Sequence, residues 1–347
     1  MSTSVLIQPS FGNPQPRKNY SKTISKRAAR ERLWIICIVQ KNGSGIKPIA
    51  VRAMHNTVMA KPKKSGSRKS QSGTSARASS RLHRLLKLAD EVTSAAGVQC
   101  SQTSGIADAG LVFDRQILLR ALEAIKAVRL LVANSHWEVA AAPTRQIFEL
   151  LINMEYLSLQ PNRTTARGDF FRFGQLQSLQ AKLGNFEYER DSGRPVNMDL
   201  LADIEDALDD PQFDQFRLAP AADGSRRWRT SWNSKNAREM SELSMHPMRK
   251  FHYQLLFRTW SEQAHGSPGI LFAQMQRYDA AKEDPELFAG DVQARSIEIV
   301  SMAITQFINL WCCLTAFPAP DTYEVQMWFA RQRVIASPLV RSQFVTK

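Results

Sequence analysis

From Arg81 onward, apolar residues recur every three to four positions, which is the spacing of one face of an α-helix. Four stretches keep this spacing over several turns: 82–97, 111–132, 137–159 and 294–315. No stretch of any length alternates apolar and polar positions as a half-buried β-strand does. The pattern therefore predicts an all-α fold, a multi-helix bundle that forms a single domain over residues 81–330 and leaves a C-terminal tail at 331–347.

The helix expected over 137–159 has its own start and stop signals. Ser135 is a candidate N-cap, because Glu138 three residues later would complete a capping box. Pro143 predicts a kink inside the helix, and Pro161 predicts its end. Further helices are expected at 167–183, at 198–208, at 236–264 with a break near Pro247, and from Ile270 onward.

Residues 1–80 show no clean periodicity. The segment 61–81 is rich in Lys, Arg, Ser and Gly and has no aromatic residue, so it cannot bury enough apolar surface to offset the entropy of ordering. We therefore expect a disordered basic tail over 1–80. Translation from Met59 would make 1–58 an extension outside the protein, and the sequence leaves Met1 and Met59 both open as the start.

The positive charge of the chain is concentrated in this tail. Residues 1–80 contain 16 Lys and Arg and one acidic residue, Glu31, which gives a formal net charge of +15. The whole chain carries +14, so residues 81–347 carry −1. Concentrated basicity is what attracts polyanions, so weak polyanion contact is expected only through 61–81, and a solvated tail is the alternative.

One apolar stretch approaches the length of a membrane span. Residues 299–320 carry no charge over 22 positions, but they include Ser301, Thr305, Gln306 and Asn309. Polar groups of this kind are costly in lipid, so we expect a buried core helix and no transmembrane segment. A monomer core and an oligomer interface are both compatible with this helix.

The four cysteines show no metal-binding spacing, and phosphate-binding glycine loops and a nucleophile elbow are absent from the sequence. Glu262-x-x-His265 has the spacing of helical di-iron ligands, but such sites need a second copy, which the chain lacks. We therefore predict no metal and no cofactor. The cysteine usage fits a reducing compartment, which favours a cytoplasmic location.

Arg145, Glu149 and Asn153 form a polar stripe on the otherwise apolar helix at 137–159, each about one turn after the last. Two interpretations stay open. The stripe is either a solvent-exposed pair with little effect on stability, or an Arg–Glu pair that faces a central polar pocket, where each charge needs the other.

A second group of polar residues lies in the segment 251–267, FHYQLLFRTWSEQAHGS. If this segment is helical through His265, then Arg258, Ser261, Glu262 and His265 lie within one arc of roughly 100°. The structural interpretation is an ordinary helix end at His-Gly-Ser-Pro. The functional interpretation makes His265 a general acid or base at a helix terminus.

The Arg258–His265 spacing resembles the Arg-x(4–6)-His motif of the small helical nuclease superfamily found in toxins and antiviral systems. The resemblance implies metal-independent RNA cleavage, in which His265 moves protons and Arg258 stabilises the phosphate. The chain departs from that motif after Arg258, where Thr259 and Trp260 replace the polar residue that the superfamily places next.

Several segments together resemble a family of uncharacterised bacterial helical proteins that carries only a domain-of-unknown-function label. The likeness covers roughly residues 110–315, and these residues carry it: Arg145-Gln-Ile-Phe-Glu149, Tyr156-Leu157, Trp232-Asn-Ser-Lys-Asn-Ala-Arg238-Glu239-Met240, Tyr253 and Ser261-x-x-x-His265-Gly266-Ser267. The resemblance implies that Arg145, Glu149, Tyr253, Ser261 and His265 converge. It assigns no reaction.

Two functions are compatible with these patterns. The first is a non-catalytic binding or regulatory module, whose polar pocket uses Arg145, Glu149, Tyr253 and Ser261 to hold a ligand or a partner chain. The alternative is an RNA-cleaving enzyme that uses His265 and an arginine. The neutral charge of residues 81–347 favours the first, because nucleic-acid binding needs concentrated positive charge.

Overall fold

The structure is a computed structural model that describes residues 72–337 apart from 223, 261–266 and 284. All of these residues belong to one compact unit, Val58–Lys347, and the other unit, Met1–Thr57, lies outside the described residues. Regular structure in the described part is helical except for two short antiparallel strands. The predicted all-α fold class is confirmed, whereas the predicted tail up to residue 71 lies outside the described residues.

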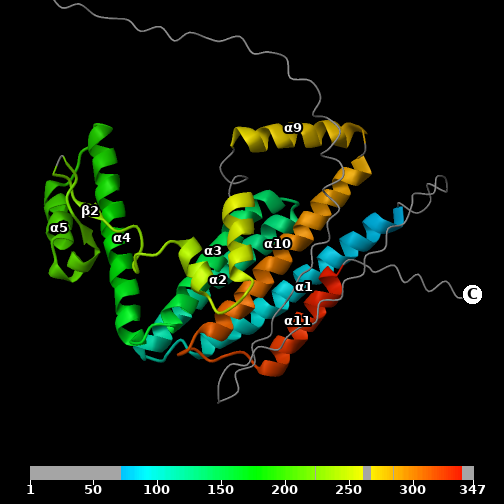
Figure 1. Cartoon of the computed structure of the whole chain (residues 1–347), viewed down its shortest axis with the longest axis horizontal. Coiled ribbons are helices and arrows are strands. Elements are labelled where there is room, and N and C mark those ends of the chain that lie inside the picture. Colours follow the sequence, from blue (N-terminus) through cyan, green and yellow to red (C-terminus); the bar gives the residue numbers. More distant parts are fainter. Residues whose placement is uncertain (1–71, 223, 261–266, 284, 338–347) are drawn as a thin grey trace, which may run out of the picture. The chain divides into compact units, whose positions relative to one another are not determined.

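Five long helices pack against one another around the main hydrophobic core (Figure 1). They are α1 (Ser72–Gln102), α2 (Ala109–Ala133), α3 (Trp137–Ser158), α10 (Pro285–Cys313) and α11 (Thr322–Ala336). The core contains fully buried side chains from four of them, including Leu88, Leu118, Ile147, Leu151 and Phe307. The predicted periodicity thus corresponds to the packed faces of α1, α2, α3 and α10.

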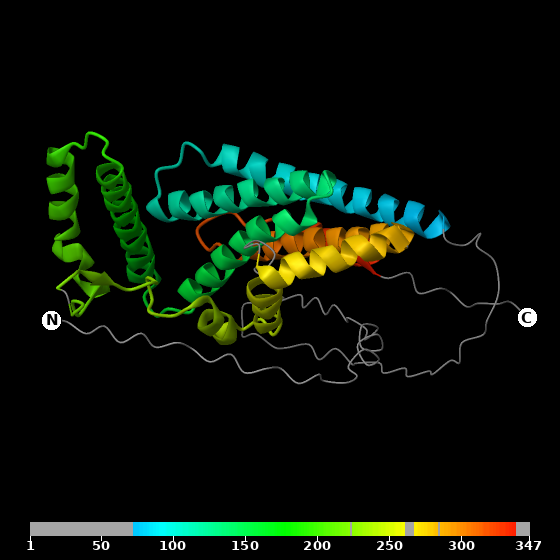
Figure 2. The same ribbon diagram turned by 90° about the horizontal axis from the view of Figure 1, so that it is seen from above.

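Helix α10 packs against α1, α2 and α3 (Figure 2). Its stretch Ala289–Cys313 is the one helix in the described residues that is long and apolar enough to cross a membrane, and 72% of its most apolar window is buried by the rest of the protein. The expected core helix is therefore observed, and it begins at Pro285, earlier in the chain than the pattern predicts.

A smaller group of elements follows α3. It consists of α4 (Arg163–Asp191), α5 (Met198–Leu208), the 3₁₀ helix η2 (Pro211–Phe216) and a two-stranded sheet of β1 (Arg217–Leu218) and β2 (Arg227–Trp228). Asn162 and Asn197 cap α4 and α5 through their side-chain oxygens. Phe173 of α4 packs edge-on against Phe216, with ring centroids 5.3 Å apart, which joins α4 to η2.

The segment after β2 contains α6 (Ala237–Leu243), α7 (Arg249–Tyr253), the π-helix η3 (Gln254–Thr259) and α9 (Pro268–Glu283). The predicted break near Pro247 is present between α6 and α7. Residues 254–259 form the π-helix η3, which has i→i+5 hydrogen bonding and Trp260 as its C-cap, whereas the rest of the segment up to His265 lies outside the described residues. The spacing of 100° per residue therefore does not apply within η3, and the expected arc of Arg258 and His265 stays a prediction.

Other features near the helix ends also differ from the predicted ones. Ser135 is not an N-cap: it has φ of 65° and donates its amide hydrogen to Val132 within the turn between α2 and α3, and His136 is the N-cap without a side-chain hydrogen bond. Helix α1 begins at Ser72 rather than Arg81. Helix α11 was not expected, and it continues to Ala336.

Candidate functional site

The segment from Trp232 to Phe257 runs antiparallel along α3. Trp232 contacts Asn153 near the C-terminal end of α3, whereas Phe257 lies 6.0 Å from Phe148 and beneath the Arg145 guanidinium, nearer its N-terminal end. The polar stripe predicted on α3 therefore lies under this segment.

Arg145 and Glu149 form the N-terminal part of the stripe. Arg145 Nε donates to Glu149 Oε1 at 2.9 Å, and the two side chains are 34% and 43% exposed. The Arg145 guanidinium carbon lies 3.9 Å from the centre of the Phe257 ring, and Tyr253 stacks on the same ring at 4.8 Å. The pair is thus partly exposed, and one side of it is covered by aromatic rings.

The structure therefore brings three predicted site residues, Arg145, Glu149 and Tyr253, into one cluster around Phe257. Ser261 and His265 lie outside the described residues. Arg258 lies in η3, but its side chain is not among the described ones. The roles predicted for Ser261, His265 and Arg258 therefore remain predictions.

Asn153 continues the stripe and connects it to the loop that precedes α6. Its Nδ2 donates to the Glu149 carbonyl oxygen at 2.7 Å, and its Oδ1 accepts from Trp232 Nε1 at 2.7 Å. The Trp232 ring also packs edge-on against Tyr156 and Phe170, at 5.7 and 5.6 Å between centroids. Trp232 is thereby fixed from three sides and is only 8% exposed.

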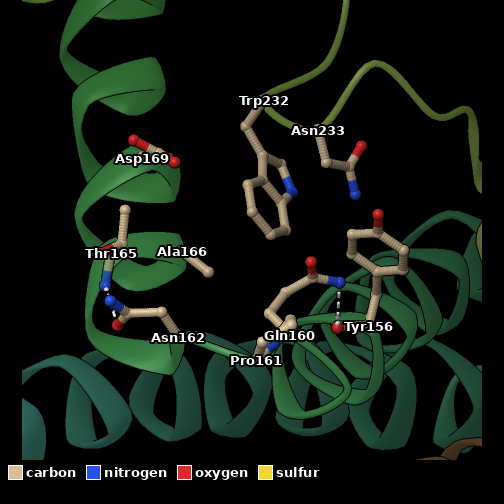
Figure 3. A pocket seen from close by; sticks show the side chains of 9 residues that line it. All are labelled: Tyr156, Gln160, Pro161, Asn162, Thr165, Ala166, Asp169, Trp232 and Asn233. Carbon is tan, nitrogen blue, oxygen red and sulfur yellow. Dashed lines mark hydrogen bonds between the residues drawn. The ribbon is translucent and has the colours of Figure 1, made fainter.

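Beside Trp232 lies an open pocket of about 370 Å³ between the end of α3, the start of α4 and the loop before α6 (Figure 3). Figure 3 shows the α4 residues Thr165, Ala166 and Asp169 across from Trp232 and Tyr156. The lining residues are Tyr156, Gln160, Pro161, Asn162, Thr165, Ala166, Asp169, Trp232 and Asn233. This pocket shares no residue with the Arg145 cluster.

Asp169 is the charged member of this lining. Its Oδ1 accepts hydrogen bonds from Arg172 Nη2 and from Gln215 Nε2, the second at 3.0 Å. Its Oδ2 accepts no hydrogen bond from the part of the chain that the structure describes, and the side chain is 24% exposed. Asp169 therefore has one carboxylate oxygen that remains able to bind a donor.

A buried ion pair joins the C-terminal part of α3 to α7. Arg249, at the start of α7, donates from Nη2 to Glu155 Oε1 at 2.6 Å and from Nε to both carboxylate oxygens at 2.9 and 3.0 Å. Ser244 Oγ donates to Glu155 Oε2 at 2.7 Å. Arg249 is 1% exposed and Glu155 is 17% exposed, so each charge depends on the other for compensation.

Two histidines accompany this pair. Burial, reinforced by the nearby Arg249 guanidinium, lowers the pKa of His252 to about 3 and that of His246 to about 4. Both imidazoles are therefore neutral at pH 7. His252 Nδ1 and Arg249 Nη1 are buried and have no hydrogen-bond partner among the described residues. The cluster connects the α6–α7 loop to α3, and the Arg249 side chain within it is shielded from solvent.

The described residues contain no group of three or more His, Cys, Asp or Glu side chains placed to hold a metal ion. The pocket lining offers amide, hydroxyl and carboxylate groups together with two aromatic rings. Such an arrangement can bind a small organic molecule through hydrogen bonds and ring contacts.

Sequence reasoning missed Asp169, Glu155 and Arg249. Glu155 had a detectable signal, since it is a lone acid on the side of α3 that also carries Phe148 and Ile152, where a charge requires a partner. Asp169 had none, because it lies in a polar helix with many similar residues. Trp232 enters the sequence patterns only through the family resemblance.

Comparison with known proteins identifies one relationship. No curated protein and no solved structure shows significant similarity to the chain. One family model, described as Family of unknown function (DUF5677), matches residues 115–281, which extend from α2 into α9. The matched range includes the Arg145 cluster, the buried Glu155–Arg249 pair and the Trp232 pocket. The predicted resemblance is thus confirmed for residues 115–281, which match the DUF5677 family of unknown function.

Proposed function

We propose that the chain is a non-catalytic module that binds a small molecule in the pocket beside Trp232. The observation that supports this proposal most directly is the pocket itself, whose volume of about 370 Å³ lies at the lower end of the range of ligand sites. Two aromatic side chains, Tyr156 and Trp232, provide apolar surface. Several convergent amide, hydroxyl and carboxylate groups provide the polar contacts that fix a ligand's orientation.

The walls of this pocket are fixed before any ligand binds. Trp232 is oriented by its hydrogen bond to Asn153 and by its contacts with two rings. Asn162 caps α4 by accepting from the Thr165 amide at 3.0 Å, and Gln160 Nε2 donates to the Tyr156 carbonyl oxygen at 3.1 Å. A ligand therefore loses little affinity to ordering of the site.

The chemistry of the lining supports binding rather than catalysis. The described lining residues include no His, Cys, Lys or Ser, and no hydrogen bond joins the Thr165 hydroxyl to the Asp169 carboxylate, which instead binds Arg172 and Gln215. The titratable side chains of the lining are Asp169 and Tyr156.

The cysteine usage supports a cytoplasmic location for this activity. Cys100, Cys312 and Cys313 are free thiols in the described part of the chain. Unpaired thiols are typical of proteins that work in a reducing compartment.

The proposal can be tested by ¹⁹F NMR on the full chain labelled with 5-fluorotryptophan. The chain has seven tryptophans, and the Trp232 signal is identified by its loss in Trp232→Phe. We screen mixtures of small amine, amide and aromatic fragments at millimolar concentration. The expected result is a group of fragments that shift the Trp232 signal in a saturable manner.

A pocket-filling variant and a matched control make the test specific. Thr165 lines the pocket, and its side chain makes no capping bond, so Thr165→Phe should fill the pocket and abolish the shifts. Thr164 is the exposed neighbour outside the lining, so Thr164→Phe should preserve them. The proposal is wrong if no fragment shifts the Trp232 signal, or if Thr165→Phe and Thr164→Phe respond alike.

A further inference from the structure

We infer that the ligand of the Trp232 pocket carries a positive charge, as a protonated or quaternary amine. This inference rests on the proposed binding function and specifies the chemical class of the ligand. Two features of the lining carry it: the aromatic rings and the charge balance.

The aromatic feature comes from Trp232 and Tyr156. The Trp232 Nε1–H is already donated to Asn153, so the part of this side chain that remains for a ligand is its ring (Figure 3). The Tyr156 ring packs at 72° to the Trp232 ring, so the two rings form two differently oriented walls. The faces of aromatic rings are electron-rich and attract cations, and because Trp232 is only 8% exposed, the half-buried Tyr156 ring offers the larger share of this surface.

The charge balance comes from Asp169. The described lining contains no Lys or Arg, and Asp169 is its charged residue. Arg172 and Gln215 both bind Oδ1, which leaves Oδ2 able to accept a hydrogen bond from an ammonium group. Arg172 offsets part of the Asp169 charge from outside the lining, but an anionic ligand would still face this carboxylate with no cation in the lining itself.

The start of α4 favours an anionic ligand instead, because the N-terminal end of a helix carries a partial positive charge. Its effect falls off within the first turn, and Asn162 already accepts from the Thr165 amide there. Asp169 lies in the second turn of α4, so a cation bound to Asp169 lies beyond the region where this effect is strongest.

The experiment compares choline with its neutral carbon isostere, 3,3-dimethyl-1-butanol, on the full chain. The two probes have the same shape and differ in the charge of the central atom. Binding is measured by titration of the ¹⁹F signal of Trp232. We expect choline to bind at least about tenfold more tightly than the alcohol, because the rings and the carboxylate both favour the cation.

Two carboxylate variants separate a local from a general effect of charge. Asp169→Asn retains an oxygen that can accept from Arg172 and Gln215, and it should reduce the preference for choline to less than about threefold. Asp191→Asn removes the same charge from the far end of α4, where the Asp191 side chain is 70% exposed, and should leave the preference unchanged. Circular dichroism and the remaining tryptophan signals show whether each variant is folded.

The outcomes separate this inference from the proposed function. Equal affinity for choline and the alcohol overturns the inference and supports binding in the pocket. If neither probe binds but the fragment screen yields only uncharged ligands that Thr165→Phe excludes, the cationic class is wrong and the proposed function stands. If neither probe nor any fragment shifts the Trp232 signal, both proposals fall.

Discussion

The Trp232 indole donates a 2.7 Å hydrogen bond to the Asn153 side chain, and the two residues are 79 positions apart in the chain. Asn153 in turn donates to the backbone of α3, so the indole is connected to a helix whose neighbouring residues are part of the core. This bond fixes one wall of the pocket and holds the loop before α6 against α3. Removing this one hydrogen bond by mutation therefore tests how strongly the loop is held against the helix.

Replacement of Asn153 by alanine should destabilise the protein and loosen Trp232. The buried indole N–H loses its acceptor, which costs about 1–3 kcal/mol of the free energy of unfolding. Urea unfolding measures this cost, and the ¹⁹F signal of Trp232 should broaden or shift. Asn134→Ala is the matched control, because Asn134 Nδ2 makes the same i→i−4 bond, to the Leu130 carbonyl oxygen, without any tryptophan partner. Equal losses in the two variants would show that the indole bond contributes nothing.

The buried pair of Arg249 and Glu155 should be the most sensitive polar contact of the described residues. Arg249→Met leaves the Glu155 carboxylate without its cation in a poorly solvated site, which should cost about 3–5 kcal/mol. Arg238→Met breaks a pair with Glu242 whose arginine is 66% exposed, and it should cost less than about 1 kcal/mol. Urea unfolding compares the two variants.

A double variant tests the reason for that cost. If the loss arises from an uncompensated charge, then Arg249→Met combined with Glu155→Met should be more stable than Arg249→Met alone. A double variant that is less stable than either single variant would instead mean that shape and packing dominate at this site.

The buried His252 and the half-buried His246 predict a loss of stability under mildly acidic conditions. Their pKa values in the folded state, about 3 and about 4, lie below the value of about 6.5 expected in the unfolded chain. The unfolded state therefore binds more protons as the pH falls below about 6.5, and the free energy of unfolding decreases, by up to about 1.4 kcal/mol per pH unit for His252. His246 is less buried and should contribute less.

Urea unfolding at pH 7 and pH 5 measures this dependence. His252→Phe keeps an aromatic ring against Phe148 and removes the titrating group, so the difference in stability between the two pH values should shrink. His83→Gln changes an exposed histidine and should leave the difference unchanged. The neighbouring charges, Arg249 and Glu155, are the same in both variants. If His252→Phe keeps the full pH dependence, other groups cause it.

The helices could be predicted where their apolar faces are long. Helices α2, α3 and α10 follow the predicted periodicity because they form the core, and α5 begins and ends at the predicted residues, Met198 and Leu208. Helix α11 was missed although it had a signal, since Asp321 caps it and Trp328, Phe329 and Ile335 are spaced along one buried face.

The candidate site could be predicted only in part, for a physical reason. Arg145, Glu149 and Asn153 lie on one helix, so their alignment follows from helix geometry. The pocket is formed by residues 156–169 together with Trp232 and Asn233, and their proximity depends on how the loop before α6 packs on α3. The π-helix η3 likewise changed the spacing that connected Tyr253 to the residues after it.

The contact between Arg145 and Phe257 should be measurable as a coupling energy. The guanidinium lies 3.9 Å from the ring centre and is partly shielded from water, so a cation–π contribution of about 0.5–1 kcal/mol is expected. A double-mutant cycle of Arg145→Met and Phe257→Leu in urea unfolding isolates this term from the other contacts of each residue.

A second cycle, of Arg145→Met and Glu149→Gln, isolates the ion pair, which should contribute about 0.2–1 kcal/mol. Repeating both cycles in 1 M salt discriminates further, because the partly exposed ion pair should weaken more than the ring contact. If the first cycle gives no coupling, the guanidinium is not held over the ring, and the cluster that contains Tyr253 has no cationic member fixed at its centre.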